Sequence, residues 1–343
     1  MKTTPEEFLR RHDMYFDQMP FGELTGLYVE EMEAGLAGRP STLYMLPSYI
    51  PSDAEPRRGE SVLVIDAGGT NLRAGRAHFD ADGRPVVEAL KKRRMPGALG
   101  DAMDADTMFR RIAEFALDMA DGCRSACISF SYPCRIRPDG DGEILALAKE
   151  IEVTGAEGRA VCASLEAALV EMGAGGSRKW RLVNDSVGSL LGGMAMADRS
   201  AYADYIGFIL GTGVNACCRL PAARITKDPD AAAMGGETIV NMESGCFGKL
   251  VRGTADRRLD AESEIPGDHP AEKMISGSYY RQLLSLTLEL AAAEGELPAE
   301  YLREIGDFRI TSAHVDAFYL DPHGDNPLAR ALKTREAQDF AAG

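Results

Sequence analysis

The stretch Val64-Ile65-Asp66-Ala67-Gly68-Gly69-Thr70-Asn71-Leu72-Arg73 decides the fold of this chain. Its apolar residues are typical of a buried strand, and its paired glycines allow the positive φ angles of a tight turn. A second stretch repeats the pattern, Gly207-Phe208-Ile209-Leu210-Gly211-Thr212-Gly213-Val214-Asn215. Because the N–H groups of such turns can converge on an anion, the repeat predicts a polyphosphate held between two turns. A plain hairpin is the alternative for the first turn taken alone.

A third segment, Arg181-Leu182-Val183-Asn184-Asp185-Ser186, is a short strand that ends in polar residues. Apolar residues then recur at the spacing of one helix face, at Val187, Leu190, Leu191 and Met194. A carboxylate at the end of a strand, between two phosphate turns, is suited to be the base of a phosphoryl transfer. Capping of the following helix by Asp185 or Ser186 is the plainer alternative.

The remaining patterns predict an α/β chain with two similar lobes, each opened by a strand and a phosphate turn. We expect helices over the first fifty residues and strands at about 61–66, 72–79 and 124–131. Further apolar helix faces are predicted at 108–119, at 161–172 and at Ile275, Tyr279, Leu283, Leu286 and Leu290. We place an N-terminal helical part of the large domain at 1–57, a small domain at 58–183 and the rest of the large domain at 184–343.

Composition excludes several classes of protein. The 343 residues, 45% of them hydrophobic, can bury a sizeable core and suggest about two domains. A net charge of −15 repels phosphate backbones and argues against nucleic acid as a partner. We interpret the basic run 91–94 as a solvated strand end.

Cysteine and histidine usage and the N-terminal sequence point to a cytoplasmic protein. The seven cysteines contain no Cys-x-x-Cys pair and predict neither a disulfide framework nor a zinc site. The five histidines are scattered without ligand spacing. We find no signal peptide and no stretch that approaches the roughly 20 apolar residues of a membrane span, so we expect no membrane partner.

Taken in order, these segments resemble the hexokinases of the sugar kinase, Hsp70 and actin superfamily, in a bacterial-type form. The likeness runs from about Leu24 to about Arg330. Besides the two turns, it is carried by the segments 35–50, Ser129-Phe130-Ser131-Tyr132-Pro133-Cys134, 240–248 and Glu272-Lys273-Met274-Ile275-Ser276-Gly277. The resemblance implies a two-lobed ribonuclease H-like (actin-like ATPase) fold, with mixed sheets flanked by helices and an interdomain cleft.

The resemblance also implies an activity, the ATP- and Mg²⁺-dependent phosphorylation of a hexose, glucose or a relative, at its 6-hydroxyl. It makes Asp185 the general base and Asp66 an outer-sphere partner of Mg²⁺. The implied sugar contacts are Ser131, Lys149, Asn184, Asn215, Glu243 and Glu272. The implied phosphate contacts are Asp66, Gly68, Gly69, Thr70, Asn71 and Arg73 on one side and Gly211, Thr212 and Gly213 on the other.

Plainer interpretations stand beside these roles. Lys149 is also typical of an exposed lysine, Glu243 of a strand-end acid and Glu272 of a first-turn helix acid. Hexokinases continue past the position of Gly343, so the resemblance implies that a C-terminal portion with the adenosine-binding loops is missing and that nucleotide binding is weak. A non-catalytic sugar-binding or regulatory relative, or an inactive fragment, is the alternative function. We expect a monomer or a homodimer.

Overall fold

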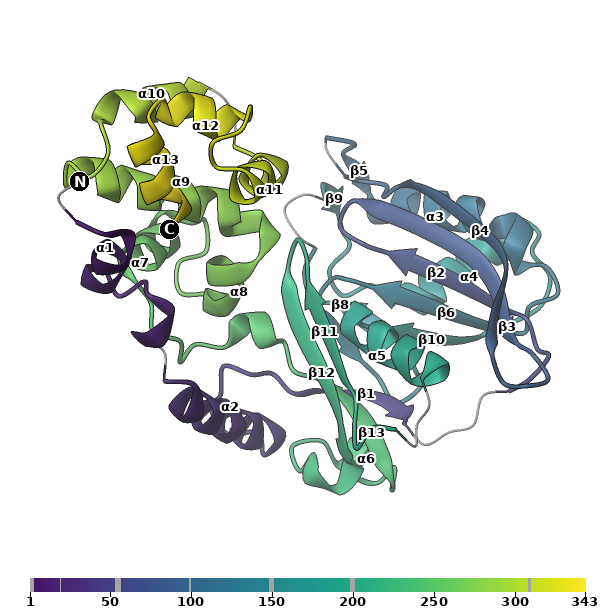
Figure 1. The fold of residues 1–343 in the computed structure, drawn as a ribbon. Helices are drawn as coiled ribbons and strands as arrows, with labels where there is room; N and C mark the ends of the chain where they lie inside the picture. Colours follow the sequence, from purple (N-terminus) through teal and green to yellow (C-terminus); the bar gives the residue numbers. More distant parts are fainter. Residues whose placement is uncertain are drawn as a thin grey trace.

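Two separate β-sheets carry the two glycine turns (Figure 1). The computed structural model describes residues 3–18, 20–52, 57–98, 100–147, 151–197, 201–307 and 310–343. The five-stranded sheet has the order β10-β6-β2-β3-β4, with β2–β3–β4 antiparallel and β6 and β10 parallel to β2. Its strands are β2 (Val62–Ala67), β3 (Asn71–Phe79), β4 (Pro85–Arg94), β6 (Ser125–Phe130) and β10 (Lys179–Val183).

One face of the five-stranded sheet is covered by the helices α3 (Ala105–Ala120) and α4 (Val161–Glu171). Alternation along β2 buries Leu63 and Ile65 completely, because every second side chain of a strand points to the same face. Helix α3 begins where Asp104 accepts a hydrogen bond from the Thr107 N–H at 2.7 Å. Its predicted apolar face packs into this core. Two small ribbons border the sheet, β5 (Met103–Asp104) with β9 (Val153–Thr154) and β7 (Cys134–Ile136) with β8 (Gly142–Ile144).

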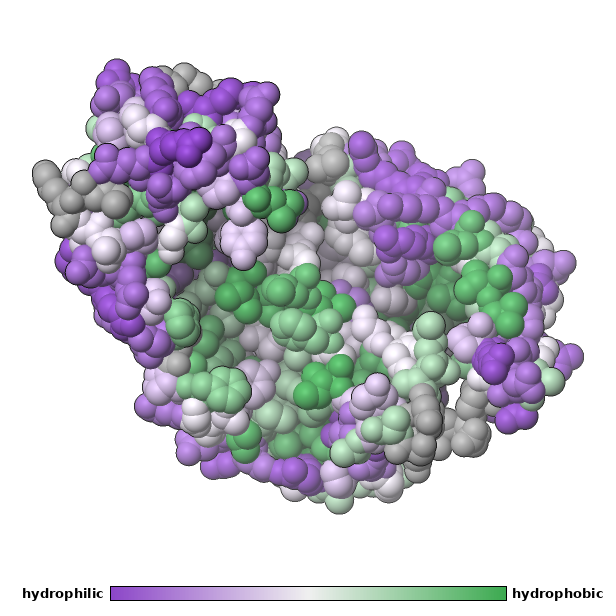
Figure 2. All heavy atoms as spheres, viewed as in Figure 1, coloured by the Kyte–Doolittle hydropathy of each residue, from purple (hydrophilic) through white to green (hydrophobic). Residues whose placement is uncertain are grey.

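The second sheet is antiparallel throughout, in the order β1-β13-β12-β11. Its strands are β1 (Leu46–Pro51), β13 (Glu237–Asn241), β12 (Val214–Pro221) and β11 (Ile206–Leu210). Helix α6 (Pro229–Ala232) and the short 3₁₀ turn η2 (Ala222–Arg224) lie between β12 and β13 in the sequence, and the 3₁₀ turn η3 (Ser244–Cys246) follows β13. Helix α5 (Asp185–Met196) packs on β11 and β12. The other face of β11 leaves Ile206, Phe208 and Leu210 between 57% and 70% exposed. Figure 2 shows hydrophobic residues gathered over this hairpin.

The C-terminal half ends in a helical cluster that also holds the N-terminus (Figure 1). Phe8 of the first helix packs with Leu288, Leu332 and Phe340 in one buried core. The helices of this region and of the N-terminus are α1 (Pro5–Arg11), η1 (Phe16–Gln18), α2 (Phe21–Leu36), α7 (Thr254–Glu262), α8 (Pro270–Ile275), α9 (Gly277–Ala293), α10 (Ala299–Asp307), α11 (Ser312–Leu320), α12 (Pro327–Leu332) and α13 (Arg335–Ala342). In the part of the chain that the structure describes, no helix has both the length and the apolar character that a membrane span requires.

Most of the predicted elements are confirmed, and two details are wrong. The strands expected near 61–66, 72–79 and 124–131 are β2, β3 and β6, and the basic run 91–94 is the exposed end of β4. The first fifty residues are not all helical, since β1 begins at Leu46. Ile275 does not belong to the long helix, because Ser276 separates α8 from α9, and its side chain is 50% exposed.

Gly207 tests how closely α5 must approach β11. A Cβ atom at this position would lie 2.3 Å from the Ser186 carbonyl oxygen and 2.5 Å from Cys217 Sγ. We expect Gly207→Ala to lower the free energy of unfolding by about 1–3 kcal/mol, because the helix must shift from the sheet. Urea unfolding measures this. The matched control is Gly192→Ala on the exposed face of α5, where a Cβ has open space and a gain of roughly 0.5–1 kcal/mol is expected. Equal stability of the two variants would contradict this packing.

Candidate active site

The site is built around the junction between β10 and α5. Asn184 is the N-cap of α5, and its Oδ1 accepts the Ser186 N–H at 2.9 Å and the Ser186 hydroxyl at 2.7 Å. Capping of this helix is therefore a role of Asn184, and not of Asp185 or Ser186 as the plainer alternative had it. Asp185 is the first helical residue, and its carboxylate accepts the Ser186 N–H at 2.8 Å in addition to its interactions with other parts of the molecule.

Asp185 lies where three strands end. Its half-buried carboxylate accepts the Ser186 N–H at 2.8 Å and is hydrogen-bonded by the side chain of Ser131, which follows β6. Burial raises the pKa of Asp185, and repulsion from Asp66 at the end of β2 adds to this rise. A carboxylate with a raised pKa binds a proton more strongly than an exposed aspartate does.

The first glycine turn joins β2 to β3. The Gly68 N–H donates to the Asn71 carbonyl at 3.0 Å, and the Tyr132 hydroxyl donates to the Gly68 carbonyl at 3.0 Å. Asp66 and Arg73 face each other across the two strands and form an ion pair of 2.5 Å. Thr70 is exposed at the tip. The turn is thus a hairpin with an exposed tip beside the Asp66–Arg73 pair, and Gly68 does not have the positive φ expected from the sequence, nor do Gly211 and Gly213 of the second turn.

The second glycine turn joins β11 to β12 and is anchored by helices α8 and α9. The carbonyls of Gly211 and Thr212 accept the N–H groups of Gly277 and Ser278 at 2.8 and 3.1 Å. Glu272 of α8 accepts the Val214 N–H at 2.9 Å. A Cβ at Gly213 would lie 2.7 Å from Glu272 Oε2, so a larger residue here would displace the Glu272 carboxylate that holds the turn.

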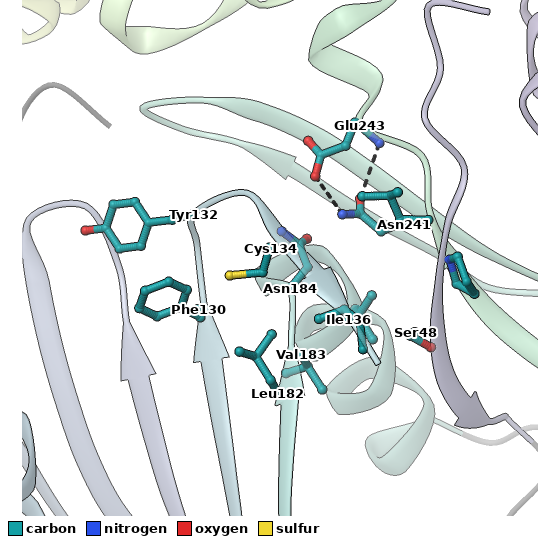
Figure 3. Close-up of a pocket in the computed structure, with 13 residues that line it drawn as sticks. Ser48, Phe130, Tyr132, Cys134, Ile136, Leu182, Val183, Asn184, Asn241 and Glu243 are labelled. Carbon is teal, nitrogen blue, oxygen red and sulfur yellow. Dashed lines mark hydrogen bonds between the residues drawn. The ribbon is translucent and has the colours of Figure 1, made fainter. Parts of the chain in front are cut away.

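A chain of side-chain amides connects the two sheets. Asn215 Nδ2 donates to Asn184 Oδ1 at 3.2 Å and to Asn241 Oδ1 at 2.8 Å. Asn241 Nδ2 in turn donates to Glu243 Oε1 at 2.8 Å (Figure 3). Asn215 Oδ1 accepts the N–H groups of Ala216 and Ser244 at 2.7 and 3.2 Å. All of its polar atoms make hydrogen bonds inside the protein, so Asn215 aligns its neighbours, and its predicted contact with a sugar would require one of these bonds to be exchanged.

Glu243 adopts a left-handed backbone conformation, with φ of 54°. This conformation is unfavourable for a residue other than glycine, and such outliers occur often at functional sites. Burial raises the pKa of Glu243, and the charges of Asp185 and Glu272 raise it further. Three carboxylates, Asp185, Glu243 and Glu272, therefore influence one another in a single region.

A narrow pocket lies beside this region, between the two sheets (Figure 3). Its volume of about 20 Å³ admits little more than one water molecule. The polar residues that line it are Asn184, Asn241 and Glu243, together with Ser48 of β1. The apolar walls are Leu46, Pro47, Phe130, Tyr132, Cys134, Ile136, Leu182, Val183 and Val187.

The structure brings half of the predicted site residues into three groups of neighbours. Asp66, Ser131 and Asp185 form one group, Asn184, Asn215 and Glu243 a second, and Gly213 and Glu272 a third. Lys149 lies outside the described residues. Asn241 was missed by the sequence reasoning, although its position at the end of a strand, two residues before Glu243, could have indicated it.

Comparison with known proteins gives the same family over both halves of the chain. Two family models described as hexokinase match residues 10–195 and 205–331. Hexokinase-1 of Oryza sativa subsp. japonica is 31% identical over 86% of this chain and 62% of its own length. Hexokinase-1 of Arabidopsis thaliana is 33% identical over 86% of this chain and 62% of its own length. The chain thus spans about three fifths of the length of these curated relatives.

A solved structure supports the fold. The hexokinase from Schistosoma mansoni, complexed with glucose, superposes with a TM-score of 0.65 and 23% identity, covering 91% of this chain and 76% of that one. The expected two-lobed actin-like ATPase fold is confirmed by this likeness and by the two mixed α/β lobes. From the family matches over 10–195 and 205–331, the chain belongs to the hexokinase family.

Proposed function

We propose that this chain transfers the γ-phosphoryl group of ATP to the 6-hydroxyl of a hexose, glucose or a close relative, with Asp185 as the general base. The observation that carries the proposal is the position of Asp185, which is half-buried at the start of α5, hydrogen-bonded by Ser131 and within the electrostatic influence of Asp66. The small domain at 58–183 would contribute Asp66 and Ser131, and the large domain, 1–57 with 184–343, would contribute Asp185 and the amide chain.

A sugar hydroxyl is a weak nucleophile, so a base has to accept its proton while the oxygen attacks phosphorus. The raised pKa of the Asp185 carboxylate suits it to accept that proton. The hydrogen bond from Ser131 and the Ser186 N–H hold the carboxylate in one orientation before the hydroxyl arrives.

The sugar would sit beside the pocket and meet polar groups of both lobes. Oδ1 of Asn184 already accepts three hydrogen bonds, so its NH₂ group is what remains for a sugar oxygen. Glu243 can accept from a sugar hydroxyl, and Asn241 orients its carboxylate. Lys149 remains a proposed sugar contact on the resemblance alone, and Glu272 a proposed one that also anchors the second turn.

The two glycine turns would receive the phosphates of ATP. Mg²⁺ prefers oxygen ligands and keeps several waters, which fits the single carboxylate of Asp66 as an outer-sphere partner. When bound, Mg²⁺ neutralises charge on the phosphates. Arg73 forms an ion pair with Asp66, and its guanidinium would exchange that carboxylate for a phosphate when ATP binds. Gly68, Gly69, Thr70 and Asn71 would contact the phosphates from one turn, and Gly211, Thr212 and Gly213 from the other.

Replacement of the proposed base is the first test. We expect Asp185→Asn to lower kcat by about 10²–10⁴-fold, because the amide cannot accept the hydroxyl proton. Coupled measurement of ATP consumption with a panel of hexoses checks this, and calorimetry checks that the hexose still binds. The control is Asp230→Asn, an exposed aspartate of α6, which should leave turnover unchanged. Undiminished sugar-dependent turnover in Asp185→Asn would refute the assignment.

The pH dependence of kcat/KM provides a second test. The base works only when deprotonated, so activity should be lost as pH falls through the pKa of Asp185. Since burial and Asp66 raise that pKa, the acidic limb should lie at a higher pH than for an ordinary aspartate. Asp66→Asn removes one negative neighbour and should move the limb to lower pH, whatever it does to kcat. A limb that stays in place would contradict the coupling of the two carboxylates.

Asn241 provides a third test, directed at the sugar. We expect Asn241→Ala to raise KM for the hexose by roughly tenfold. The substitution removes the amide that orients the Glu243 carboxylate and leaves Asn215 and Glu243 without a buried hydrogen-bond partner, at a cost of about 1–3 kcal/mol. Initial-rate kinetics measure this. Asn326→Ala is the matched control, since Asn326 is a buried asparagine that caps the remote helix α12. This control should lower thermal stability and leave KM unchanged; an equal rise in KM for both variants would point to a general loss of structure.

A further inference from the structure

A second cluster of side chains, of the types that bind metals, lies next to Glu243 and is not used by the proposed reaction. Cys246, Asp268 and His269 each present one ligand atom, and these three atoms lie within 4.8 Å of one another. The residues come from two segments, the 3₁₀ turn η3 and the residues just before α8. The scattered histidines and unpaired cysteines of the sequence predicted no such site, because the fold brings together positions that are more than twenty residues apart.

The two segments are held against each other by close packing. A Cβ at Gly245 would lie 3.2 Å from Glu272 Cβ and 2.8 Å from the Val214 carbonyl oxygen. The Cys246 side chain is buried, with 6% exposure, and Asp268 is exposed. The cluster thus has a fixed inner ligand and an outer carboxylate that solvent can reach.

The imidazole of His269 is incompletely satisfied within the described part of the chain. Its Nδ1 is buried and makes no hydrogen bond there, although Asp268 Oδ1 lies 3.0 Å away. The Nδ1–Oδ1 pair lacks hydrogen-bond geometry, so the ring nitrogen is only partly compensated for its burial. A cation between the ring nitrogen and the carboxylate would satisfy both groups.

We propose that Cys246, His269 and Asp268 bind a divalent transition metal of the zinc class. On binding, the Cys246 thiol loses its proton to solvent and the sulfur bonds the metal, with water in the fourth position. Around a tetrahedral ion the ligand atoms stand roughly 3.5 Å apart, so shifts of about an ångström complete the geometry.

The donor set selects the metal. Sulfur and imidazole nitrogen favour zinc, cobalt and related ions, whereas Mg²⁺ prefers oxygen alone. Burial, with the nearby charges of Glu243, Asp268 and Glu272, raises the pKa of Cys246 to about 12. The same charges attract a dication and so offset the cost of removing the thiol proton.

Cobalt titration of the whole chain, in buffer with a phosphine reductant that spares the metal, tests the proposal without any activity measurement. We expect CoCl₂ to give a thiolate-to-cobalt charge-transfer absorption and visible bands typical of a tetrahedral site, both abolished by ZnCl₂. Cys246→Ser should lose the charge-transfer absorption. His269→Gln should weaken cobalt affinity by more than about tenfold, since even outer-sphere partners contribute 10–100-fold.

Cys218→Ser is the matched control, because Cys218 is a partly buried cysteine of β12 outside the cluster. It should keep the full spectrum. Circular dichroism and thermal melts of all three variants establish that they are folded, and His269→Gln, changed at a partly exposed position, keeps the test valid if Cys246→Ser is unstable. Absence of the charge-transfer absorption in the unmodified chain, or its persistence in folded Cys246→Ser, would overturn the proposal.

Discussion

The hydrogen-bonded amides that run from Asn184 through Asn215 and Asn241 to Glu243 are the constraint on which the site depends. They join the end of β10 in one sheet to β12 and β13 in the other. Removing one buried member leaves its neighbours without a hydrogen-bond partner, at a cost of about 1–3 kcal/mol. The series of amides therefore acts as a unit. Because Asn184 also caps α5, the same bonds set the position of Asp185, the next residue.

Much of the fold could be predicted from the sequence because its periodicities are strong. The apolar face at 108–119 and the two glycine turns follow local rules of helix and hairpin formation, and both appear where expected. Strand β1 could not be predicted, since Pro47 and Pro51 weaken its strand pattern and only pairing with β13 makes it a strand. Ile275 has the spacing of the apolar face of the long helix, but the extended backbone of Ser276 ends helix α8 before α9 begins.

The site was predictable only in part, for a different physical reason. Asp185 and Glu243 belong to segments that are recognisable in the sequence, and in the structure the two carboxylates are near enough for the charge of Asp185 to raise the pKa of Glu243. Asn241 and the internal use of every polar atom of Asn215 depend on side-chain geometry between strands, which a single sequence does not contain. The same holds for Cys246 and His269, because no spacing rule connects a residue after β13 with a residue before α8.

Strand β11 combines an unpaired edge with exposed apolar side chains. In the described part of the chain β11 is an edge strand that pairs with β12 alone, as β4 and β10 are the edge strands of the five-stranded sheet. Its free edge adjoins the exposed side chains of Ile206, Phe208 and Leu210. An unprotected edge of this kind is a template for another extended segment. A strand added at this edge would therefore pair its free backbone groups and cover the three apolar side chains at the same time.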